Sequence, residues 1–551
     1  MNLYKYVSEK INEKLGFSAN LEVPKNRDFG DFSTNAAMIG AKSAGKNPRE
    51  LATEFVAKIQ ELDFVESVSV AGPGFINIKI KDDFILKNAT VPTNMIADKP
   101  LKIDLDYAGY NVGKALHIGH LRTTIVGDTF NRIAKFVGHK TKSYNHIGDW
   151  GRPMGLVIAW ILENGMPKSA EELNTYYPLS SARAKDDEAW MEHARKITAE
   201  LQSGNVEYRK IYDDFMKISL KQMDDVLVRL NVMPFDMTMG ERGVAEYVDE
   251  TQKILEDKHL LEKSDGALIV NVKQESDTAP MPPLMFRTSS DTQTYAAADL
   301  SAIYYRTKSD NPDVIGYFTD SRQSLHFNQV FRAAKMAGLT NAELFHTGFG
   351  ALTGNDGKPF KTRDGGVANL TDILDMVEGA VKERVNESGK KLDDETVGAI
   401  ALAAVKFNDL IHDVKSDYVF EPSAITSFEG KTGPYILYTA VRLNSVLKRA
   451  NMEIAKPTHF DLTTEERNLL IEIMDFEKTV LSAYENHATD MIANYAYDLC
   501  QLANNFYHNC PILRDDIDDK TQAGRIYIAK LAFDTLATAI DLMGLKIPEQ
   551  M

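Results

Sequence analysis

The sequence predicts an α/β protein: a Rossmann-like, doubly wound parallel sheet, preceded in the chain by a small N-terminal α/β domain and followed by an all-α C-terminal domain. Three observations support this architecture. From Leu101, segments with the two-residue period of strands alternate with segments of helical spacing, as they do in parallel sheets. A shorter α/β pattern precedes this region, and from about Leu370 long helical patterns run to the end of the chain. The domains are therefore expected at 1–90, 98–370 and 371–551.

The composition is that of a globular protein with several hydrophobic cores. The chain has 551 residues, 44% of them hydrophobic and 26% charged, and no apolar run approaches the length of a membrane-spanning helix. We therefore expect no contact with a membrane. The two cysteines fit no metal or redox spacing, so we expect a cytoplasmic protein with reduced thiols. The formal net charge of −16 argues against nucleic acid as a partner, although a local basic face can coexist with an acidic total.

The first 90 residues contain three helical patterns and two strand patterns. Residues 2–15 are expected to form an amphipathic helix that ends at Gly16. A second helix is predicted over residues 35–42, with Asp31 or Ser33 as its cap. The remaining predicted elements are a helix that Pro48 opens, strands at Val65–Val70 and Ile76–Ile80, and a linker over 91–100.

The predicted parallel sheet begins with a strand over Leu101–Asp106, in which apolar and charged residues alternate. A glycine-marked turn leads into a helix, in which Ile125, Phe130, Ile133, Ala134 and Val137 fall mostly at helical spacing and for which Gly138 is the expected end. Residues 165–255 are helical and highly charged, so they are expected to form a solvated insertion in the sheet domain. Strand-like segments then resume at Ala267–Val272, Val314–Thr319 and Leu344–Gly350.

The turn between this strand and this helix contains two histidines separated by isoleucine and glycine. The first N–H groups of a helix and its positive dipole end suit a phosphate, and His117 and His120 lie at that position. Gly119 has no side chain, so a flat ring or a phosphate can approach the backbone closely there. Two other interpretations are an ordinary capped helix start and a metal site that includes His146 and Asp149.

A second candidate site is the glycine-rich loop at 354–366, which contains Lys358, Lys361 and Arg363. Fixed cations stabilise the charge that develops around phosphorus during transfer reactions, and glycines allow such a loop to close over a nucleotide. The loop is therefore a candidate phosphate clamp. The alternative interpretation is a solvated basic loop without a ligand.

These segments resemble a known protein family. The run from Asn111 to Arg122, with its His-Ile-Gly-His core, resembles the signature of class I aminoacyl-tRNA synthetases, and its Asn-x-x-Lys beginning resembles the arginyl-tRNA synthetases. The resemblance extends over nearly the whole chain. It also includes residues 26–46, Ala71–Asn77, Asn145–Gly151, Gly433–Arg442 and Met543–Met551.

The resemblance implies a set of site residues. For catalysis these are His117, His120, Lys114, Lys361 and Arg363. For ATP binding they are Gly113, His117, Gly119, His120, Lys358 and Lys361. For arginine binding they are Asp106, Asn111, Tyr295, Asp299 and Gln323. Interpreted without the resemblance, Asp299 is a helix cap and Asp106 is a charge at the end of a strand.

The sequence departs from the family pattern at three positions. Thr362 stands where class I synthetases at large have the second lysine of their loop motif, and the resemblance implies that Lys114 supplies this cation. Tyr110 and Ala115 stand where prolines are usual. These two changes are expected to affect the stiffness of the turn and to leave the chemistry intact.

The resemblance implies ATP-dependent activation of L-arginine to arginyl-adenylate, followed by transfer to the 3′ end of tRNA(Arg). ATP is then a substrate that brings Mg²⁺, no structural metal is expected, and the protein is expected to be a monomer. Residues 1–90 would contact the D-loop of the tRNA, and residues 371–551 would contact its stem and anticodon. Two rival functions are a small-molecule nucleotidyltransferase or ligase and a catalytically inactive tRNA-binding relative.

Overall fold

The structure is a computed structural model of the whole chain. It describes residues 3–18, 21–24, 29–91, 97–289, 292–354, 356–358, 360, 369–387, 389, 391–450, 453–457 and 460–551. The expected site residues Lys361 and Arg363, and Thr362 between them, lie outside the described residues.

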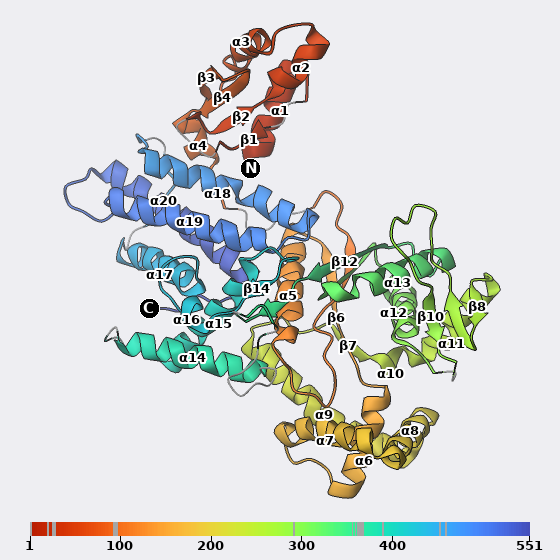
Figure 1. Cartoon of the computed structure of the whole chain (residues 1–551). Coiled ribbons are helices and arrows are strands. Elements are labelled where there is room, and N and C mark those ends of the chain that lie inside the picture. Colours follow the sequence, from red (N-terminus) through yellow and green to blue (C-terminus); the bar gives the residue numbers. More distant parts are fainter. Residues whose placement is uncertain are drawn as a thin grey trace.

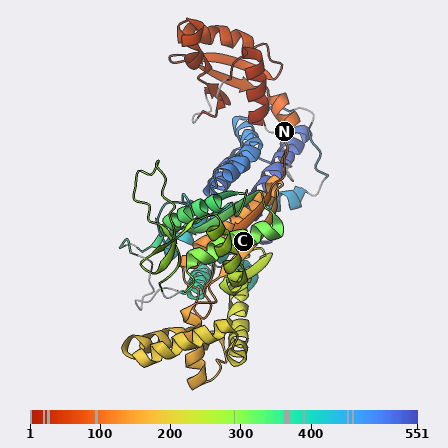
Figure 2. The ribbon, with the colours of Figure 1, turned by 90° about the vertical axis from the view of Figure 1, so that its right-hand side faces the viewer.

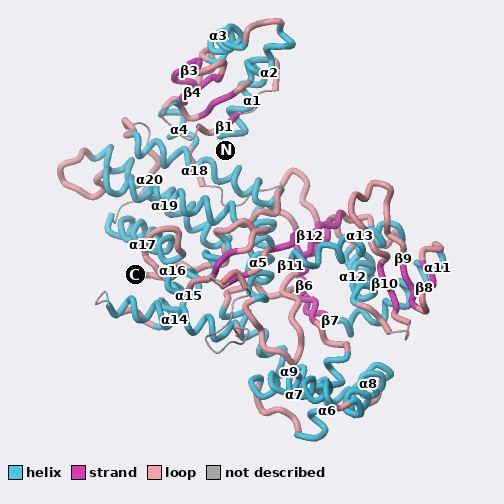
Figure 3. The backbone as a smooth tube through the Cα atoms, in the orientation of Figure 1, coloured by secondary structure: helices cyan, strands magenta, loops and turns pink. Residues whose placement is uncertain are grey.

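The molecule is elongated, with the parallel sheet near its centre (Figures 1 and 2). The N-terminal domain lies at one end, beside helices of the C-terminal region. A group of inserted helices lies at the opposite end. Figure 3 shows the strands of the sheet in the middle of the molecule, with helices around them.

The N-terminal domain contains an antiparallel sheet with the strand order β1-β2-β4-β3. Its elements are α1 (Leu3–Leu15), β1 (Leu21–Glu22), β2 (Phe32–Thr34), α2 (Ala36–Ala44), α3 (Pro48–Ile59), β3 (Val65–Ala71), β4 (Phe75–Ile80) and α4 (Asp82–Asn88). The predicted helix end at Gly16 is confirmed, because Gly16 adopts a φ of +67°. The predicted caps of α2 are wrong. Asn35 occupies the cap position, Asp31 is buried, and Ser33 lies in β2.

The central sheet contains five parallel strands in the order β12-β11-β5-β6-β7, which confirms the predicted Rossmann-like sheet. The strands are β5 (Lys102–Asp106), β6 (Lys140–Ile147), β7 (Met237–Gly240), β11 (Val314–Asp320) and β12 (Glu343–Phe349). The chain runs from β5 outward to β7 and then returns to β11 on the other side of β5. The strand order therefore reverses between β5 and β11, and ligands of such sheets bind at the carboxyl ends of the strands at that point.

Both faces of this sheet are covered by helices. Helix α5 (Gly119–Val137) packs on one face and also contacts helices α15 and α18 of the C-terminal region. Its predicted end at Gly138 is confirmed, since this residue has a φ of +105°. On the other face, α12 (Tyr295–Asp310) and α13 (Ser324–Ala337) form a core with Ile315 and Tyr317 of β11. Short helix η3 (Ser321–Gln323) precedes α13.

The two acids of β5 do not face solvent, although apolar and charged residues alternate along this strand, whereas Lys102 at its start is exposed. Asp104 and Asp106 are 2% and 7% exposed, because α12 covers the face of the sheet to which they point. A fully buried arginine on that helix, Arg306, pairs with Asp106. Asp106 is therefore an internal ion-pair residue, because a buried carboxylate needs such a partner. Asp104 has no ion pair of this kind among the described residues, and burial raises its pKa to about 7.

Two expectations about the middle of the chain are wrong. Strand β7 belongs to the central sheet, although it falls inside the insertion predicted at 165–255. It is a four-residue strand with one buried residue, so no alternation marks it in the sequence. The segment Ala267–Val272 does not continue the parallel sheet. It contributes β9 (Ala267–Val270) to an antiparallel sheet with β8 (Leu261–Ser264) and β10 (Leu284–Arg287). The helices between β6 and β8 are α6 (Arg152–Asn164), α7 (Ala170–Asp186), α8 (Glu188–Ser203), α9 (Val206–Arg229), α10 (Glu241–Val244), η2 (Ala245–Tyr247) and α11 (Val248–Asp257).

The C-terminal region is helical, as predicted, with one short exception. Its helices are α14 (Leu370–Glu387), α15 (Asp394–Leu410), α16 (Pro422–Ile425), α17 (Gly433–Ala450), α18 (Thr464–Glu485), α19 (Asp490–Asn509) and α20 (Asp519–Leu542). The exception is β14 (Tyr418–Val419), which pairs with β13 (Leu352–Thr353) and is too short to leave a periodic pattern. Among the described residues, no helix has the length and apolar character needed to span a membrane.

An arginine joins the N-terminal domain to the C-terminal helices. Arg467 on α18 donates hydrogen bonds to Asp31 Oδ2 at 2.5 Å and to the Ile80 carbonyl at 2.6 Å. It also pairs with Asp82 at the start of α4. Arg467 and Asp31 are 8% and 4% exposed, so water and salt screen this pair only weakly.

We expect Arg467→Met to weaken the docking of the N-terminal domain. Removing one partner of a buried ion pair leaves the other uncompensated, at a cost of about 3–5 kcal/mol. In calorimetry, the N-terminal domain should unfold at a lower temperature than in the native protein, and it should be released faster by limited proteolysis. Arg514→Met removes an arginine that pairs with Asp516 at the surface and serves as the control. Unchanged unfolding of the Arg467→Met protein would contradict this role.

Candidate active site

A cavity of about 590 Å³ lies at the carboxyl ends of β5 and β11, where the strand order reverses. It is lined by all five residues that the sequence analysis expected to bind arginine: Asp106, Asn111, Tyr295, Asp299 and Gln323. His117, Gly119 and His120 of the histidine turn line the same cavity. The fold therefore brings together residues from the β5–α5 turn, the start of α12 and the segment after β11.

The two histidine rings are held by the backbone of their own turn. The N–H of His117 donates to Nδ1 of His120 at 3.1 Å, and the N–H of Gly119 donates to Nδ1 of His117 at 3.1 Å. The rings stack with their centroids 3.9 Å apart. Each Nδ1 accepts a hydrogen bond, so the proton of each neutral ring lies on Nε2.

Burial keeps these rings neutral. Burial, together with the smaller effects of His117 and Lys114, lowers the pKa of His120 to about 3. Burial and the charge of Lys114 also lower the pKa of His117. At neutral pH both rings therefore act as uncharged Nε2–H donors. They do not act as cations.

The N-terminus of α5 is less open than the sequence suggested. The N–H groups of Gly119, His120 and Leu121 already donate to Nδ1 of His117 and to the carbonyls of His117 and Ile118. A Cβ atom on Gly119 would lie 2.8 Å from Cε1 of His117. The close approach that was expected of a ligand at Gly119 is therefore made by the His117 ring, and the ring Nε2–H groups become the candidate phosphate donors.

The acids of the cavity have different partners. Asp299 lies within α12 and accepts a hydrogen bond from Nε2 of His326 at 2.5 Å, while Thr294 caps the helix. The interpretation of Asp299 as a helix cap is therefore wrong. Asp106 ends β5, pairs with Arg306 and still lines the cavity. Glu241 also lines the cavity, and burial, with a smaller contribution from Asp149, raises its pKa to about 7.

The segment Asn145–Gly151 borders the cavity, which His146 and Gly148 line. Asn111 forms a β-bridge with Gly148, and a Cβ atom on Gly148 would lie 2.5 Å from the Asn111 side-chain oxygen. Only glycine allows this approach. Asp149 accepts hydrogen bonds from the Tyr212 hydroxyl at 2.8 Å and from the Arg242 N–H at 3.1 Å. Its carboxylate therefore has structural partners. In the part of the chain that the structure describes, no group of three or more His, Cys, Asp or Glu side chains is arranged to hold a metal ion.

The other predicted site residues that the structure describes, Gly113, Lys114 and Lys358, do not line this cavity. The ammonium of Lys114 lies over the Tyr177 ring of α7, 4.5 Å from its centroid, and Lys114 lines a separate groove between the histidine turn, α7 and α9. The N–H of Gly113 donates to Ser219 at 3.2 Å. Lys358 is exposed. The structure thus does not bring these residues to the arginine candidates, although Lys114 is close enough to the histidines to lower their pKa.

Four residues near the cavity were not singled out by the sequence analysis as site residues. His326 lies three residues after Gln323, so its helical spacing was a usable signal. Glu241 follows β7, which had no recognisable pattern, and Arg306 is distant from Asp106 in the sequence. Tyr110 is buried, and its hydroxyl is hydrogen-bonded to the Thr124 hydroxyl at 2.7 Å. Its ring also makes an edge contact with the ring of His120. Its effect therefore reaches beyond the stiffness of the turn.

Three family models match successive parts of the chain. The model described as tRNA synthetases class I (R), catalytic domain, matches residues 85–422, beyond the boundary expected near 370. The model of the arginyl tRNA synthetase N-terminal domain matches residues 2–80. The model of the DALR anticodon binding domain matches residues 436–551.

Similar proteins cover the same length. The arginine–tRNA ligase of Alkaliphilus oremlandii is 35% identical, over 98% of this chain and 98% of that protein. The arginine–tRNA ligase of Agathobacter rectalis is also 35% identical, over 99% of this chain and 98% of that protein. The structure of Thermus thermophilus arginyl-tRNA synthetase superposes with a TM-score of 0.85 at 22% identity, with all of both chains covered. The structure of Plasmodium falciparum arginyl-tRNA synthetase superposes with a TM-score of 0.83 at 22% identity, over 100% of this chain and 98% of that chain.

We expect His120 to remain uncharged across the physiological range. Its pKa of about 3 means that the ring should keep its Nε2–H form between about pH 5 and 8. Nitrogen NMR of protein labelled in histidine can follow this ring, with His120→Gln identifying its signals. A titration midpoint near the ordinary histidine value of about 6.5 would contradict the neutral donor that we derive from the geometry.

Proposed function

We propose residue roles for a chain that belongs to the arginyl-tRNA synthetase family and is an arginine–tRNA ligase. The observation that supports these roles is the single cavity lined by five expected arginine-binding residues and two neutral histidines. In the reaction, a carboxylate oxygen of L-arginine attacks the α-phosphorus of ATP and pyrophosphate leaves. The arginyl group then passes from AMP to a hydroxyl at the 3′ end of tRNA(Arg).

His117 and His120 are proposed to stabilise the phosphate during activation. Charge moves onto the phosphate oxygens as the bond to pyrophosphate breaks, and preorganised donors lower the energy of that state. The Nε2–H groups are such donors, since both Nδ1 atoms are held by backbone N–H groups. Gly113, Gly119, Lys358 and Lys361 are proposed to contact ATP, and Lys361 and Arg363 to add positive charge over its phosphates.

The guanidinium of arginine is proposed to bind among Asp299, Glu241 and Tyr295. A guanidinium is planar, always charged and carries five donors, so it requires acidic and planar acceptors. Asp299 already holds His326, and Glu241 lies within the electrostatic reach of Asp299. Glu241 should ionise when the guanidinium enters, because an opposite charge favours the charged form. Asp106, Asn111 and Gln323 are proposed to orient the rest of the substrate.

Lys114 is proposed to supply the cation that Thr362 does not provide. Its ammonium now lies on the Tyr177 ring, and a lysine stem has four flexible carbons with which to turn toward ATP. The proximity of Lys114 to both histidines supports this role.

The C-terminal helices are proposed to contact the tRNA stem and anticodon. The tyrosine pocket, of about 570 Å³, is lined by Tyr435, Tyr438, Arg442 and Met551, among others. Bases that leave a stack are commonly held on aromatic rings and beside arginine. The pocket therefore offers a local binding surface in a chain whose formal net charge is −16.

Several finer points stay predictions. The N-terminal domain is proposed to contact the D-loop of the tRNA. Mg²⁺ is proposed as a partner of the ATP phosphates. A monomeric, cytoplasmic protein remains the expectation from the sequence.

The function is tested by charging purified tRNA(Arg) with labelled arginine. A charged product that forms with arginine and ATP, and fails with other amino acids, is the expected result. Pyrophosphate exchange without tRNA should be near background, as the resemblance implies. An inactive relative would bind tRNA without charging it. A small-molecule nucleotidyltransferase would not require the DALR domain that is matched over residues 436–551.

Asp299→Asn should reduce selectivity for arginine. The change removes a charged partner of the guanidinium, so KM for arginine should rise by at least ~10-fold, because leaving that charge unpaired costs a few kcal/mol. Activation should be measured with arginine and with the uncharged analogue citrulline. Asp249→Asn, which changes an exposed acid that pairs with Arg287, is the matched control. A variant that still strongly prefers arginine would move selectivity to Glu241 or Asp106.

Lys114→Ala should slow formation of the adenylate strongly, while KM for ATP changes less. A cation that acts only in the transition state lowers kcat, whereas one that binds ground-state phosphate raises KM. Single-turnover kinetics with saturating tRNA can separate the two. Thr362→Lys in the Lys114→Ala background should restore part of the rate.

Tyr177→Leu distinguishes this role from a structural one. It removes the ring on which Lys114 rests and leaves the lysine in place. If Lys114 only anchors α7, Tyr177→Leu should slow the reaction as much as Lys114→Ala does. If Lys114 acts on ATP, the Tyr177→Leu enzyme should keep its rate.

A further inference from the structure

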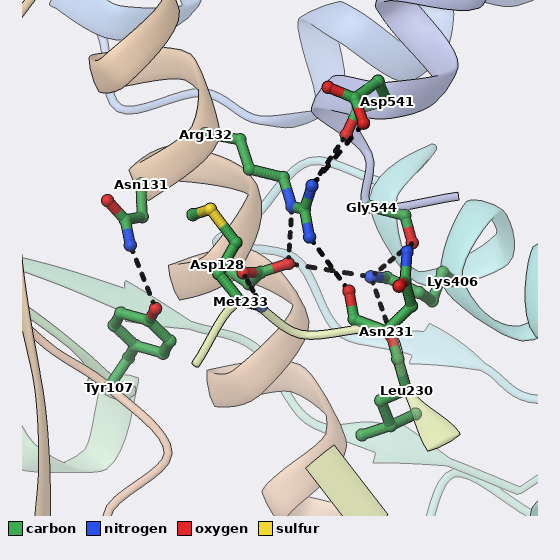
Figure 4. Close-up of polar contacts among 10 residues, drawn as sticks. All are labelled: Tyr107, Asp128, Asn131, Arg132, Leu230, Asn231, Met233, Lys406, Asp541 and Gly544. Carbon is green, nitrogen blue, oxygen red and sulfur yellow. Dashed lines mark hydrogen bonds and ion pairs between the residues drawn. The ribbon is translucent and has the colours of Figure 1, made fainter. Parts of the chain in front are cut away.

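A second group of buried charges lies further along helix α5, about two to three turns beyond His120. Figure 4 shows its polar contacts. The buried lock, as we call it, consists of Asp128 and Arg132 of α5, Lys406 of α15 and Gly544 after α20. Lys406 and Asp128 are both 0% exposed. A buried lysine is costly unless it is paired and hydrogen-bonded, so the partners of Lys406 define what this group does.

Lys406 binds the C-terminal ends of two helices. Its Nζ donates to the carbonyls of Leu230 and Gly544, each at 3.1 Å, and lies 3.8 Å from Asp128 Oδ2. Leu230 caps α9, and Gly544 follows α20. Terminal carbonyls of helices lack partners within the helix and carry the negative end of the dipole, so they suit a cation. Burial lowers the pKa of Lys406 to about 8, and its amine is therefore mostly protonated at neutral pH.

Arg132 also contacts the C-terminal ends of these two helices, α9 and α20. Its Nε pairs with Asp128 Oδ2 at 2.9 Å, and its two terminal nitrogens donate to the carbonyls of Asn231 at 3.0 Å and Asp541 at 3.3 Å. Asp128 Oδ1 accepts from the N–H of Met233 at 2.9 Å. One carboxylate of α5 thus holds two cations, which together hold the ends of α9 and α20.

The backbone at Gly544 is specific to this contact. Gly544 adopts a φ of +65°, and a Cβ atom there would lie 2.4 Å from Lys406 Nζ and 3.0 Å from Asp128 Oδ2. Its carbonyl also accepts from the Asn231 side chain at 3.0 Å. Both the positive φ and the close approach require glycine at this position. The chain end that follows Gly544 is therefore anchored at one point against α5.

That chain end leads to the proposed tRNA surface. Residues 546–550 line a groove with Thr396, Ala399 and other residues of α15, and Met551 lines the tyrosine pocket. From the lock, α5 leads in the other direction to His120 and the cavity. The lock is thus the shared anchor of the helix that carries the histidines and of the C-terminal tail, residues 545–551.

We propose that Lys406 and Asp128 are positioning residues for tRNA binding, which act by fixing Gly544 and the C-terminal tail against α5. The inference rests on the proposed contact of the tyrosine pocket with tRNA. A lock that only stabilises the fold would lower the unfolding temperature and leave the Michaelis constants alone. A lock that positions the tail raises KM for tRNA selectively.

The first test is Lys406→Met in the full chain, with Lys382→Met as the matched control. Lys382 is an exposed lysine of α14 that pairs with Glu378 and Asp394. We expect KM for tRNA to rise ~10-fold in Lys406→Met, which corresponds to about 1.4 kcal/mol. KM for arginine and for ATP should stay within about twofold, as should all three constants in the control. An unchanged KM for tRNA, or an equal rise for all substrates, would overturn the proposal.

The second test asks whether the tail carries the effect. Removal of residues 546–551 should raise KM for tRNA, and Lys406→Met should add at most about twofold in the shortened chain, because coupled sites are not additive. Full additivity would overturn the proposal. If Lys406→Met does not fold, Gly544→Ala replaces it, since the added Cβ displaces the same ammonium. Loss of folding in both would assign the lock a purely structural role and would also overturn the proposal.

Arg442→Ala separates a failure of this inference from a failure of the proposed function. If Arg442→Ala raises KM for tRNA and Lys406→Met does not, the pocket binds tRNA and the lock does not position it. If neither variant changes KM for tRNA, the tyrosine pocket is not a tRNA contact, and the proposed function of the C-terminal helices fails with the lock.

Discussion

Most residues of helix α5 are buried, most of the polar ones included. The helix lies between the central sheet and the C-terminal helices, so its polar side chains must find partners inside the protein. Arg122 is 0% exposed, donates to the carbonyls of Gly350 at 2.9 Å and Ser416 at 2.7 Å, and pairs with Asp409 at 3.2 Å. Asp128 makes the equivalent connections further along the helix. These contacts join the sheet domain to the C-terminal helices through the helix that begins beside the histidines.

Charge balance shapes the cavity at the start of this helix. Asp106 is paired with Arg306, and Asp299 is hydrogen-bonded to His326. Glu241 has no cationic partner among the described residues, and its pKa of about 7 reflects burial near other acids. Glu241 and Asp299, which has a histidine as its partner, suit the guanidinium that is proposed to bind there, because a positive charge would pair with both acids.

The histidine turn shows how a local motif depends on its surroundings. Neutral rings with free Nε2–H groups arise from two backbone hydrogen bonds and from burial, and Tyr110 adds an edge contact to His120. Where the family usually has proline, this chain therefore has a side chain that touches the ring. The hydrogen bonds and ring contacts described above hold the turn, and its Nε2–H groups carry no charge at neutral pH.

Local sequence patterns predicted the parallel sheet, the helical C-terminal region and the histidine turn, and the family resemblance implied the arginine candidates. Strand and helix periods report which side of an element is buried, and glycines such as Gly16 and Gly138 mark helix ends, so these features are local. The partner of Asp106, the cavity acid Glu241 and the contacts of Lys406 became visible only in the tertiary structure. Arg306 lies 200 residues from Asp106, and Gly544 lies 138 residues from Lys406. Local periodicity carries no record of such pairings, because they follow from which buried faces meet when the helices pack on the sheet.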